Sequence, residues 1–247
     1  MRREVQARYR QSWLGLLWLI LTPLLMLSIY TLVFRHVMKM RWVGVDESNL
    51  SFALRVYAGL AVFNFFAECV NRAPGLILEQ PNLVKKVVFP LEVLAWVNVC
   101  VAAVGLLVPM ALFLALLLFS EGGLPWTVLA LPLVWLPLLP LCLGLTWLFA
   151  GLGAYVRDIG QVLSMAVTAL MFLSPIFFPI EALPDSVRNW MAMNPLALVM
   201  TQTREVLLAG RWPSWGMLAL QTLASGLVAV AGAAFFRVAR RGFADVI

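Results

Sequence analysis

The chain has 247 residues, of which 63% are hydrophobic and 12% are charged, and its formal net charge is +6. This balance excludes an ordinary soluble domain, because most of the chain must be solvated by lipid or by other apolar helices. The basic residues lie at the ends of apolar stretches, where membrane topology accounts for them. We expect no nucleic-acid binding, since the sequence carries no basic stripe and no recognised binding module.

The first apolar stretch runs from Trp13 to Phe34 and carries no charge. A hydrocarbon core of about 30 Å needs roughly 20 helical residues, so this run is long enough to cross it. It is too long for the apolar region of a signal peptide, and no small-residue cleavage site follows it. Arg2, Arg3, Arg8 and Arg10 precede it, which favours a cytoplasmic N-terminus. Residues 1–13 are expected to form an interfacial helix with an apolar stripe at Val5, Tyr9 and Trp13.

Five more apolar stretches follow, so the sequence predicts an all-α membrane protein with six transmembrane helices. Spans two to six are expected at residues 54–69, 93–119, 126–154, 162–178 and 217–236. The fourth is overlong and contains prolines, which membrane helices tolerate where neighbours satisfy the freed carbonyls. Six crossings return both termini to the cytoplasmic side, and residues 1–247 are expected to form a single transmembrane domain.

Three connections between the spans differ in character. Residues 35–53 are polar and mixed in charge, which predicts an outer loop. Residues 72–92 mix apolar clusters with Lys85 and Lys86, which favours a short cytoplasmic helix against another protein; a solvated loop is the alternative. Residues 179–215 are too apolar for a plain loop and too interrupted for a crossing. They predict two short re-entrant helices in the outer leaflet, with an amphipathic surface helix as the alternative.

Catalytic and metal-binding constellations are missing from the sequence. His36 is the only histidine, and Cys69, Cys100 and Cys142 are isolated, so we expect no metal site. No GxxxxGK[ST] loop is present, so a nucleotide cannot bind by that route and no cofactor is expected in this chain. Glu68 is the only acidic candidate near a span. We expect a solvated or capped carboxylate at the cytoplasmic interface, which disfavours ion-coupled transport and leaves a partner as the energy source.

Five short motifs lie in order along the whole chain. They are Arg8-Tyr9-Arg10-x-Ser12-x-Leu14-Gly15-x-x-Trp18 followed by Pro23, Asn82-Leu83-Val84-Lys85-Lys86-Val87-x-Phe89-Pro90, Arg157-Asp158-Ile159, Ser174-Pro175-Ile176, and Asn194-Pro195. Together they resemble the motifs of type-2 ABC exporter permeases for polysaccharides, which are the O-antigen, capsule and teichoic-acid exporters.

The resemblance implies a half-transporter in the bacterial inner membrane. Two copies would pair as a homodimer, and two separate ABC ATP-binding subunits, which hold ATP and Mg, would attach on the cytoplasmic side. It places Arg8, Tyr9, Arg10 and Trp13 in the membrane interface. It makes residues 72–92 the docking segment for the ATPase, with candidate docking residues Pro81, Asn82, Lys85, Lys86, Phe89, Arg157 and Asp158. It also implies a channel between the two copies, lined largely by the first and fifth helices.

Aromatic residues near the outer side suit such a channel. A sliding sugar chain needs flat, non-ionic faces, and aromatic rings can pack on the apolar faces of pyranoses. Tyr30 and Phe34 of span one, with Phe172, Phe177 and Phe178 of span five, are the candidates for a collar around the sugar. The alternative is that these rings pack between helices or anchor them in the interface.

The sequence therefore favours the non-catalytic membrane subunit of an ABC exporter. The expected substrate is a lipid-linked polysaccharide of the O-antigen type, moved from cytoplasm to periplasm. Capsular polysaccharide and teichoic-acid exporters are alternatives within the class, and type-2 ABC drug or lipid exporters are more distant. A membrane-embedded lipid-sugar transferase would need catalytic acids or bases grouped at one membrane face, and the sequence shows no such group.

Overall fold

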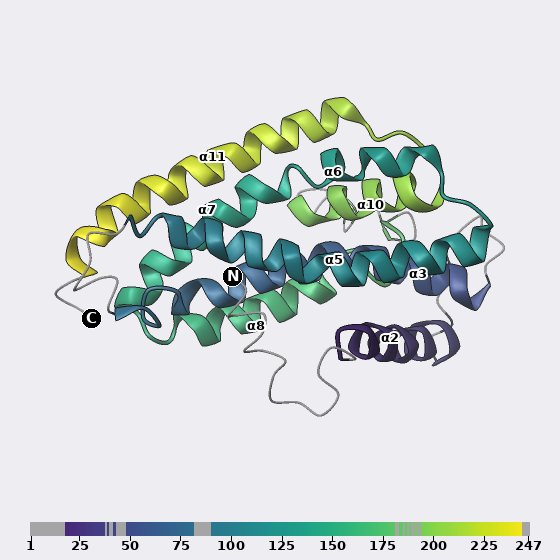
Figure 1. The fold of residues 1–247 in the computed structure, drawn as a ribbon, viewed down its shortest axis with the longest axis horizontal. Helices are drawn as coiled ribbons and strands as arrows, with labels where there is room; N and C mark the ends of the chain where they lie inside the picture. Colours follow the sequence, from purple (N-terminus) through teal and green to yellow (C-terminus); the bar gives the residue numbers. More distant parts are fainter. Residues whose placement is uncertain are drawn as a thin grey trace.

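Long helices lie side by side in the computed structural model, and most of them run along its longest axis (Figure 1). The structure describes residues 18–37, 39, 42, 48–81, 90–180, 183, 184, 186, 188, 191 and 194–243. Every regular element in these ranges is helical, as the apolar runs predict. Several expected site residues lie outside the described residues: Arg8, Tyr9, Arg10, Trp13, Asn82, Lys85, Lys86 and Phe89.

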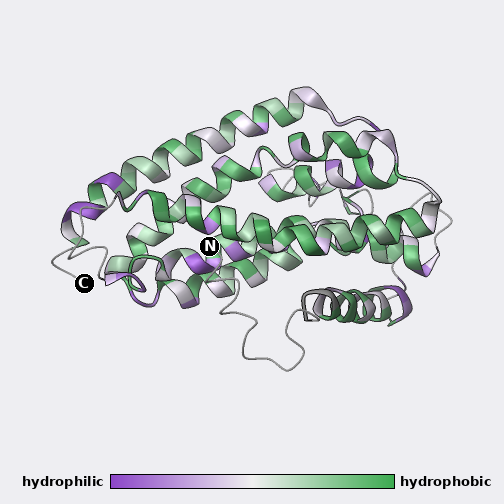
Figure 2. Ribbon diagram, viewed as in Figure 1, coloured by the Kyte–Doolittle hydropathy of each residue, from purple (hydrophilic) through white to green (hydrophobic). Residues whose placement is uncertain are grey.

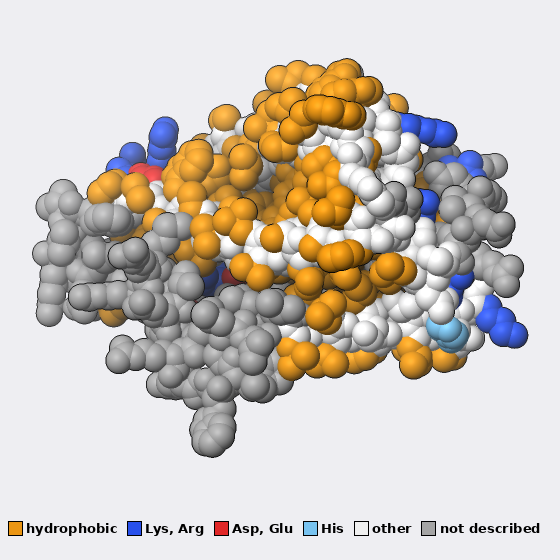
Figure 3. Space-filling model, turned by 45° about the vertical axis from the view of Figure 1, so that its right-hand side comes forward, with side chains coloured by type: hydrophobic (Ala, Val, Ile, Leu, Met, Phe, Trp, Pro, Cys, Tyr) orange, Lys and Arg blue, Asp and Glu red, His pale blue; other side chains and the backbone are white. Residues whose placement is uncertain are grey.

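Four helices in these ranges are long and apolar enough to cross a membrane: Asn49–Gly75, Val93–Ser120, Trp126–Tyr155 and Trp215–Gly242. They fall on the second, third, fourth and sixth predicted spans. Two shorter apolar helices, Leu21–Val37 and Ile159–Phe172, fall on the first and fifth. Hydrophobic residues make up most of these helices (Figure 2). On the face drawn in Figure 3, the Lys and Arg side chains lie mostly toward the two ends of the molecule.

Helix α3 (Asn49–Arg72) is the centre of the bundle, and most of its side chains are buried. It contacts α2, α5, α7, α8 and α10. The helix begins at Asn49 and not at Leu54 as expected. The reason is a cap, because the side chain of Ser48 accepts a hydrogen bond from the N–H of Ser51 and so satisfies the first turn.

Helix α5 (Val93–Glu121) matches the third predicted span and ends at a glycine. Gly122 has a φ of 69°, and its N–H bonds to the carbonyl of Leu118, which is a left-handed helix end that glycine adopts without strain. Within α5, the carbonyl of Pro109 accepts a hydrogen bond of 3.1 Å from the hydroxyl of Tyr57. This bond joins the middle of α5 to α3.

Within the membrane-length stretch Trp126–Tyr155, the fourth predicted span is divided into three consecutive helical segments. They are η4 (Trp126–Ala130), α6 (Leu131–Val134) and α7 (Leu138–Tyr155). Pro132 lies in the first turn of α6, and Pro137 immediately precedes α7. Proline lacks an N–H and fits the first turn of a helix, so two of the prolines start helices here.

The fifth predicted span is shorter than expected. Helix α8 (Ile159–Phe172) ends at Phe172, whereas the sequence predicted a helix as far as Phe178. Pro175 disfavours helical backbone at the preceding Ser174, so the chain turns there.

The first span is described as α2 (Trp18–Tyr30) and a π-helical continuation, η2 (Thr31–Val37). Helix α10 (Pro195–Leu208) lies within residues 179–215, where the sequence predicts short helices.

Helix α11 (Trp215–Ala239) lies along α7 (Figure 1) and ends in the short helix η6 (Arg240–Gly242). The two long helices approach closely because glycines face each other. A Cβ on Gly144 would lie 2.5 Å from the carbonyl oxygen of Val228, and a Cβ on Gly232 would overlap the carbonyl of Gly144. Small residues at such crossings are typical of helix packing in membranes, where close backbone contact replaces the hydrophobic effect.

Candidate functional site

Four of the five aromatic residues expected to line a sugar conduit meet at the end of α8. The rings of Phe34 and Phe177 stack with centroids 4.0 Å apart and planes 7° apart. Tyr30 and Phe172 lie 5.2 and 6.5 Å from Phe177, measured between ring centroids. Phe178 is half-buried and packs against the same core. We refer to Tyr30, Phe34, Phe172 and Phe177 as the aromatic cluster.

The members of the aromatic cluster differ in exposure. Phe177 is 2% exposed and Phe172 is 60% exposed, while Tyr30 and Phe34 are half-buried. Phe177 is therefore the packing centre within this chain, and Phe172 offers a ring face to whatever lies outside it. Contact of these rings with a sugar stays a prediction.

A polar stripe follows one exposed side of α8. Gln161, Ser164 and Thr168 are exposed, and their spacing of three and four places them on one helix face that continues to Phe172. The hydroxyl of Thr168 donates to the carbonyl of Ser164 at 2.8 Å. Polar side chains within a membrane helix usually face the bundle interior or a water-filled cavity and avoid lipid. This stripe was not predicted from the sequence, although its spacing is visible in residues 161–168.

Two of the sequence motifs, Ser174-Pro175-Ile176 and Asn194-Pro195, meet in space. The side-chain nitrogen of Asn194 donates to the hydroxyl of Ser174 at 2.9 Å, and that hydroxyl donates to the carbonyl of Leu170 at 2.7 Å. The side-chain oxygen of Asn194 accepts from the N–H of Leu196 at 2.9 Å and so caps α10. Asn194 therefore joins the start of α10 to the end of α8.

Arg204 of α10 is 6% exposed and was not among the expected site residues. Its Nε donates to the carbonyl of Arg55 at 2.9 Å, its Nη1 to that of Pro175 at 2.6 Å and its Nη2 to that of Ile176 at 2.8 Å. The centre of the guanidinium group lies 4.6 Å from the ring centroid of Trp42. Hydrogen bonds from a charged donor are stronger than neutral ones, so Arg204 fastens α3 and the turn after α8 to α10.

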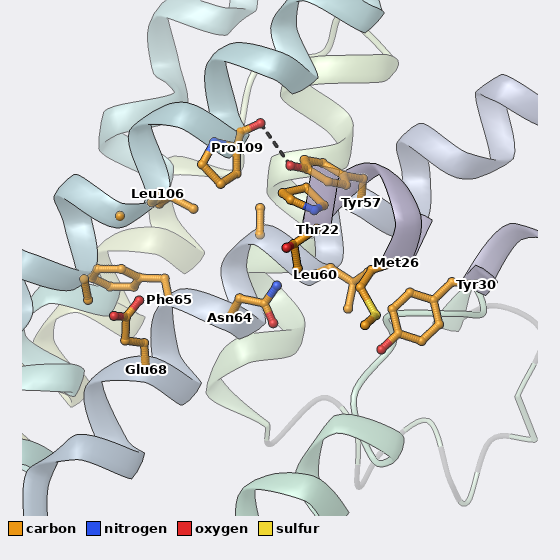
Figure 4. A pocket seen from close by; sticks show the side chains of 14 residues that line it. Thr22, Met26, Tyr30, Tyr57, Leu60, Asn64, Phe65, Glu68, Leu106 and Pro109 are labelled. Atoms are coloured by element: carbon orange, nitrogen blue, oxygen red, sulfur yellow. Dashed lines mark hydrogen bonds between the residues drawn. The ribbon is translucent and has the colours of Figure 1, made fainter. Parts of the chain in front are cut away.

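A cavity of about 330 Å³ lies between α2, α3 and α5 (Figure 4). Its lining is largely apolar, with polar side chains from Thr22, Asn64 and Glu68. Glu68 is half-buried and lies one turn before α3 ends. Tyr30 lines the cavity and also belongs to the aromatic cluster, so the two features adjoin.

The chain that follows α3 packs onto the bundle at the opposite end from the aromatic cluster. Pro74 lies against α7 so closely that a Cβ on Gly153 would come within 2.5 Å of the Cα of Pro74. Ile77 is fully buried together with Phe236 and Phe243. The described beginning of residues 72–92 is therefore packed against the bundle, which argues against a plain solvated loop there.

The expected docking residues that the structure describes lie around this end. Arg157 and Asp158 are exposed in the turn between α7 and α8, and Pro81 is exposed where the described part of the docking segment ends. Nearby, Arg240 forms an ion pair with Glu92, which precedes α5. A protein docked here would therefore contact the C-terminal ends of α3, α7 and α11 and the N-terminal ends of α5 and α8.

Comparison with known proteins gives a consistent result. A model of the family described as ABC-2 type transporter matches residues 1–208. An "O-antigen export system permease protein RfbA" from Myxococcus xanthus is 29% identical over 248 residues, covering 100% of this chain and 93% of the relative. A protein of the same name from Klebsiella pneumoniae is 24% identical, covering 99% and 92%. The "Polysialic acid transport protein KpsM" of Escherichia coli is 27% identical over 213 residues, covering 84% and 79%.

Proposed function

Because the chain belongs to the ABC-2 type transporter family, we propose that it is the membrane-spanning subunit of an ATP-driven polysaccharide exporter. Its substrate is a lipid-linked polysaccharide of the O-antigen type, which it carries from the cytoplasm to the periplasm across the bacterial inner membrane. The observation that carries this proposal is similarity along the entire chain to proteins named as O-antigen export permeases.

The chain itself is not an enzyme in this proposal. Its sequence has no phosphate-binding loop, so the energy comes from two separate ATP-binding subunits that hold ATP and Mg. These subunits dock at the end of the bundle that carries Pro81, Arg157 and Asp158, together with residues 82–89. The packing of Pro74 and Ile77 on the bundle supports this, because a force applied to the docking segment then reaches α7 and α11 directly.

The channel lies between two copies of the chain. The polar stripe of α8 supports this arrangement, since Gln161, Ser164 and Thr168 are exposed in one chain and are poorly suited to lipid. A second copy facing α8 across a water-filled space would give these side chains a polar environment. Phe172 continues the stripe toward the aromatic cluster, so a sugar chain that follows α8 meets polar groups first and aromatic rings last.

The topology consists of six crossings with both termini in the cytoplasm. The four membrane-length helices supply four crossings, and α2 with η2 and α8 supply the first and fifth. Helix α10 is one of the two short helices that dip into the outer leaflet between the fifth and sixth crossings. Contacts of α10 with α3, α6 and η4 support this placement, because a helix that dips into the membrane needs other protein around it.

A capsular exporter is the second candidate. It is favoured by the similarity to the polysialic acid transport protein KpsM and to a capsule polysaccharide export protein of Neisseria meningitidis. The aligned part of these proteins is shorter, at 84% and 78% of this chain. The O-antigen assignment therefore comes first.

Complementation tests the proposed function. The gene would be expressed with that of its ATP-binding partner in cells that make O-antigen and lack their own export permease. Surface O-antigen should return, and it should not return with a partner whose ATP-binding lysine is replaced. If both proteins are folded in the membrane and the polysaccharide still accumulates inside, the O-antigen assignment is wrong. The same complementation in cells that make a capsular polysaccharide and lack their own export permease tests the second candidate.

A further inference from the structure

Gly59 of α3 makes the room in which the guanidinium group of Arg204 lies. A Cβ at residue 59 would be 2.5 Å from Nη2 of Arg204 and 3.4 Å from the Cα of Ile176. A Cβ does not approach another atom as closely as 2.5 Å, so any larger residue at 59 would displace the guanidinium. The carbonyl that receives Nε belongs to Arg55, one turn earlier on the same helix.

The three hydrogen bonds of Arg204 use the shape of the guanidinium group. Nη1 and Nη2 reach the consecutive carbonyls of Pro175 and Ile176, and Nε points to α3. A planar fork with fixed donor directions can hold carbonyls on two segments at once, which the single ammonium of lysine cannot reproduce. The shape of the side chain is therefore as important here as its charge.

The fastened backbone leads directly to the aromatic cluster. Phe177 follows Ile176, is 2% exposed, and stacks on Phe34 at 4.0 Å. No helix supports this stretch, because α8 has ended at Phe172. The bonds from Arg204 hold the two carbonyls that immediately precede Phe177, while the bond from Asn194 holds the chain at Ser174.

We propose that Arg204 is a positioning residue for the aromatic cluster. Its guanidinium group holds the carbonyls of Pro175 and Ile176 so that Phe177 stays stacked on Phe34. Gly59 leaves the space that this guanidinium group occupies. The consequence for export rests on the proposed function, because the aromatic cluster then keeps a fixed shape at the outer end of the conduit. The positioning itself is a property of the folded chain and is independent of any substrate.

Hydrogen exchange on the full-length chain in lipid nanodiscs, without polysaccharide, tests the positioning. In Arg204→Met and Arg204→Lys, amide exchange at residues 176–178 should rise at least about tenfold, because charge-assisted bonds to this stretch are lost. Exchange in α7 and α11 should stay unchanged. Arg188→Met is the matched control, since Arg188 is an exposed arginine bonded to the carbonyl of Leu183 at 3.2 Å. This variant should leave amide exchange at residues 176–178 unchanged.

Gly59→Ala supplies the decisive comparison. It should raise exchange at residues 176–178 when Arg204 is present and add nothing in the Arg204→Met background, where no guanidinium remains to be displaced. The proposal is overturned if Arg204→Lys behaves like the unchanged chain, if exchange rises equally in all helices, or if Gly59→Ala has the same effect in both backgrounds. Failure of polysaccharide export by the unchanged chain would instead contradict the proposed function, and the exchange results would still stand.

Discussion

The side-chain nitrogen of Asn194 lies 2.9 Å from the hydroxyl oxygen of Ser174, and this bond ties the start of α10 to the end of α8. Both residues belong to short motifs that are separate in the sequence. The bond shows why an asparagine serves at this position: one end of its amide caps α10, and the other end donates to Ser174.

Replacing Asn194 should separate these two roles. Asn194→Asp keeps an oxygen for the cap and loses the donor to Ser174, whereas Asn194→Ala loses both. We expect Asn194→Ala to destabilise the chain by roughly 1–2 kcal/mol and Asn194→Asp by less. The midpoint of thermal unfolding, monitored as the loss of monodisperse purified protein in detergent, shows which variant is less stable. Equal midpoints for the two variants would mean that the bond to Ser174 contributes more than the cap.

The exposure of the aromatic cluster predicts different effects for two of its members. Phe177→Ala empties a buried site, which typically costs about 3–5 kcal/mol, so it should reduce the amount of folded protein in the membrane. Phe172→Ala removes an exposed ring and should leave that amount unchanged. If Phe172 contacts the sugar, export per folded transporter should fall in a graded way. Unchanged export per folded molecule would return Phe172 to the packing or anchoring alternative.

The polar stripe of α8 can be tested by making it apolar. Leucine at Gln161, Ser164 and Thr168 together should lower export strongly, because the stripe would no longer bind water or sugar hydroxyls. Met165→Leu, on an exposed neighbouring position of the same helix, is the matched control. If the stripe faced lipid, the leucines would be harmless, and an unchanged export rate with normal protein levels would show that.

The docking segment can be tested by reversing charges. Lys85→Glu together with Lys86→Glu should weaken binding of the ATP-binding subunit, and Arg157→Glu should do the same from the adjoining turn. Membrane insertion should stay normal, since these residues lie outside the predicted spans. Co-purification of the two proteins measures the effect, with Lys39→Glu in the outer connection as the control. Full co-purification of the charge-reversed chains would leave residues 72–92 without a docking role.

The long apolar runs could be predicted well from sequence, because an uninterrupted run can only be satisfied as a buried or lipid-facing helix. Helices α5 and α11 begin and end within a few residues of the third and sixth predicted spans. The break in the fourth span and the early end of α8 were not predicted. In both places a proline starts a new segment or stops an old one, and apolar composition alone does not distinguish these from a tolerated proline.

The candidate site could be predicted only in part. The sequence identified the aromatic rings of spans one and five, and the structure brings four of them together. It could not show that Phe177 is buried while Phe172 is exposed, because that difference arises from the turn after α8. Arg204 could not be recognised from the sequence, since its partners Arg55, Pro175 and Ile176 are 149, 29 and 28 residues away along the chain.

The most direct test of the account is translocation by the purified complex. The chain and its ATP-binding subunit would be reconstituted in vesicles with the docking side outward, and a labelled lipid-linked O-antigen would be supplied from outside. We expect ATP-dependent protection of the glycan from an added glycosidase. The chain alone, or the complex with an inactive ATP-binding subunit, should give none. Protection without the partner, or none with a folded complex that hydrolyses ATP, would contradict the central claim that this chain is a polysaccharide conduit driven by a separate ATPase.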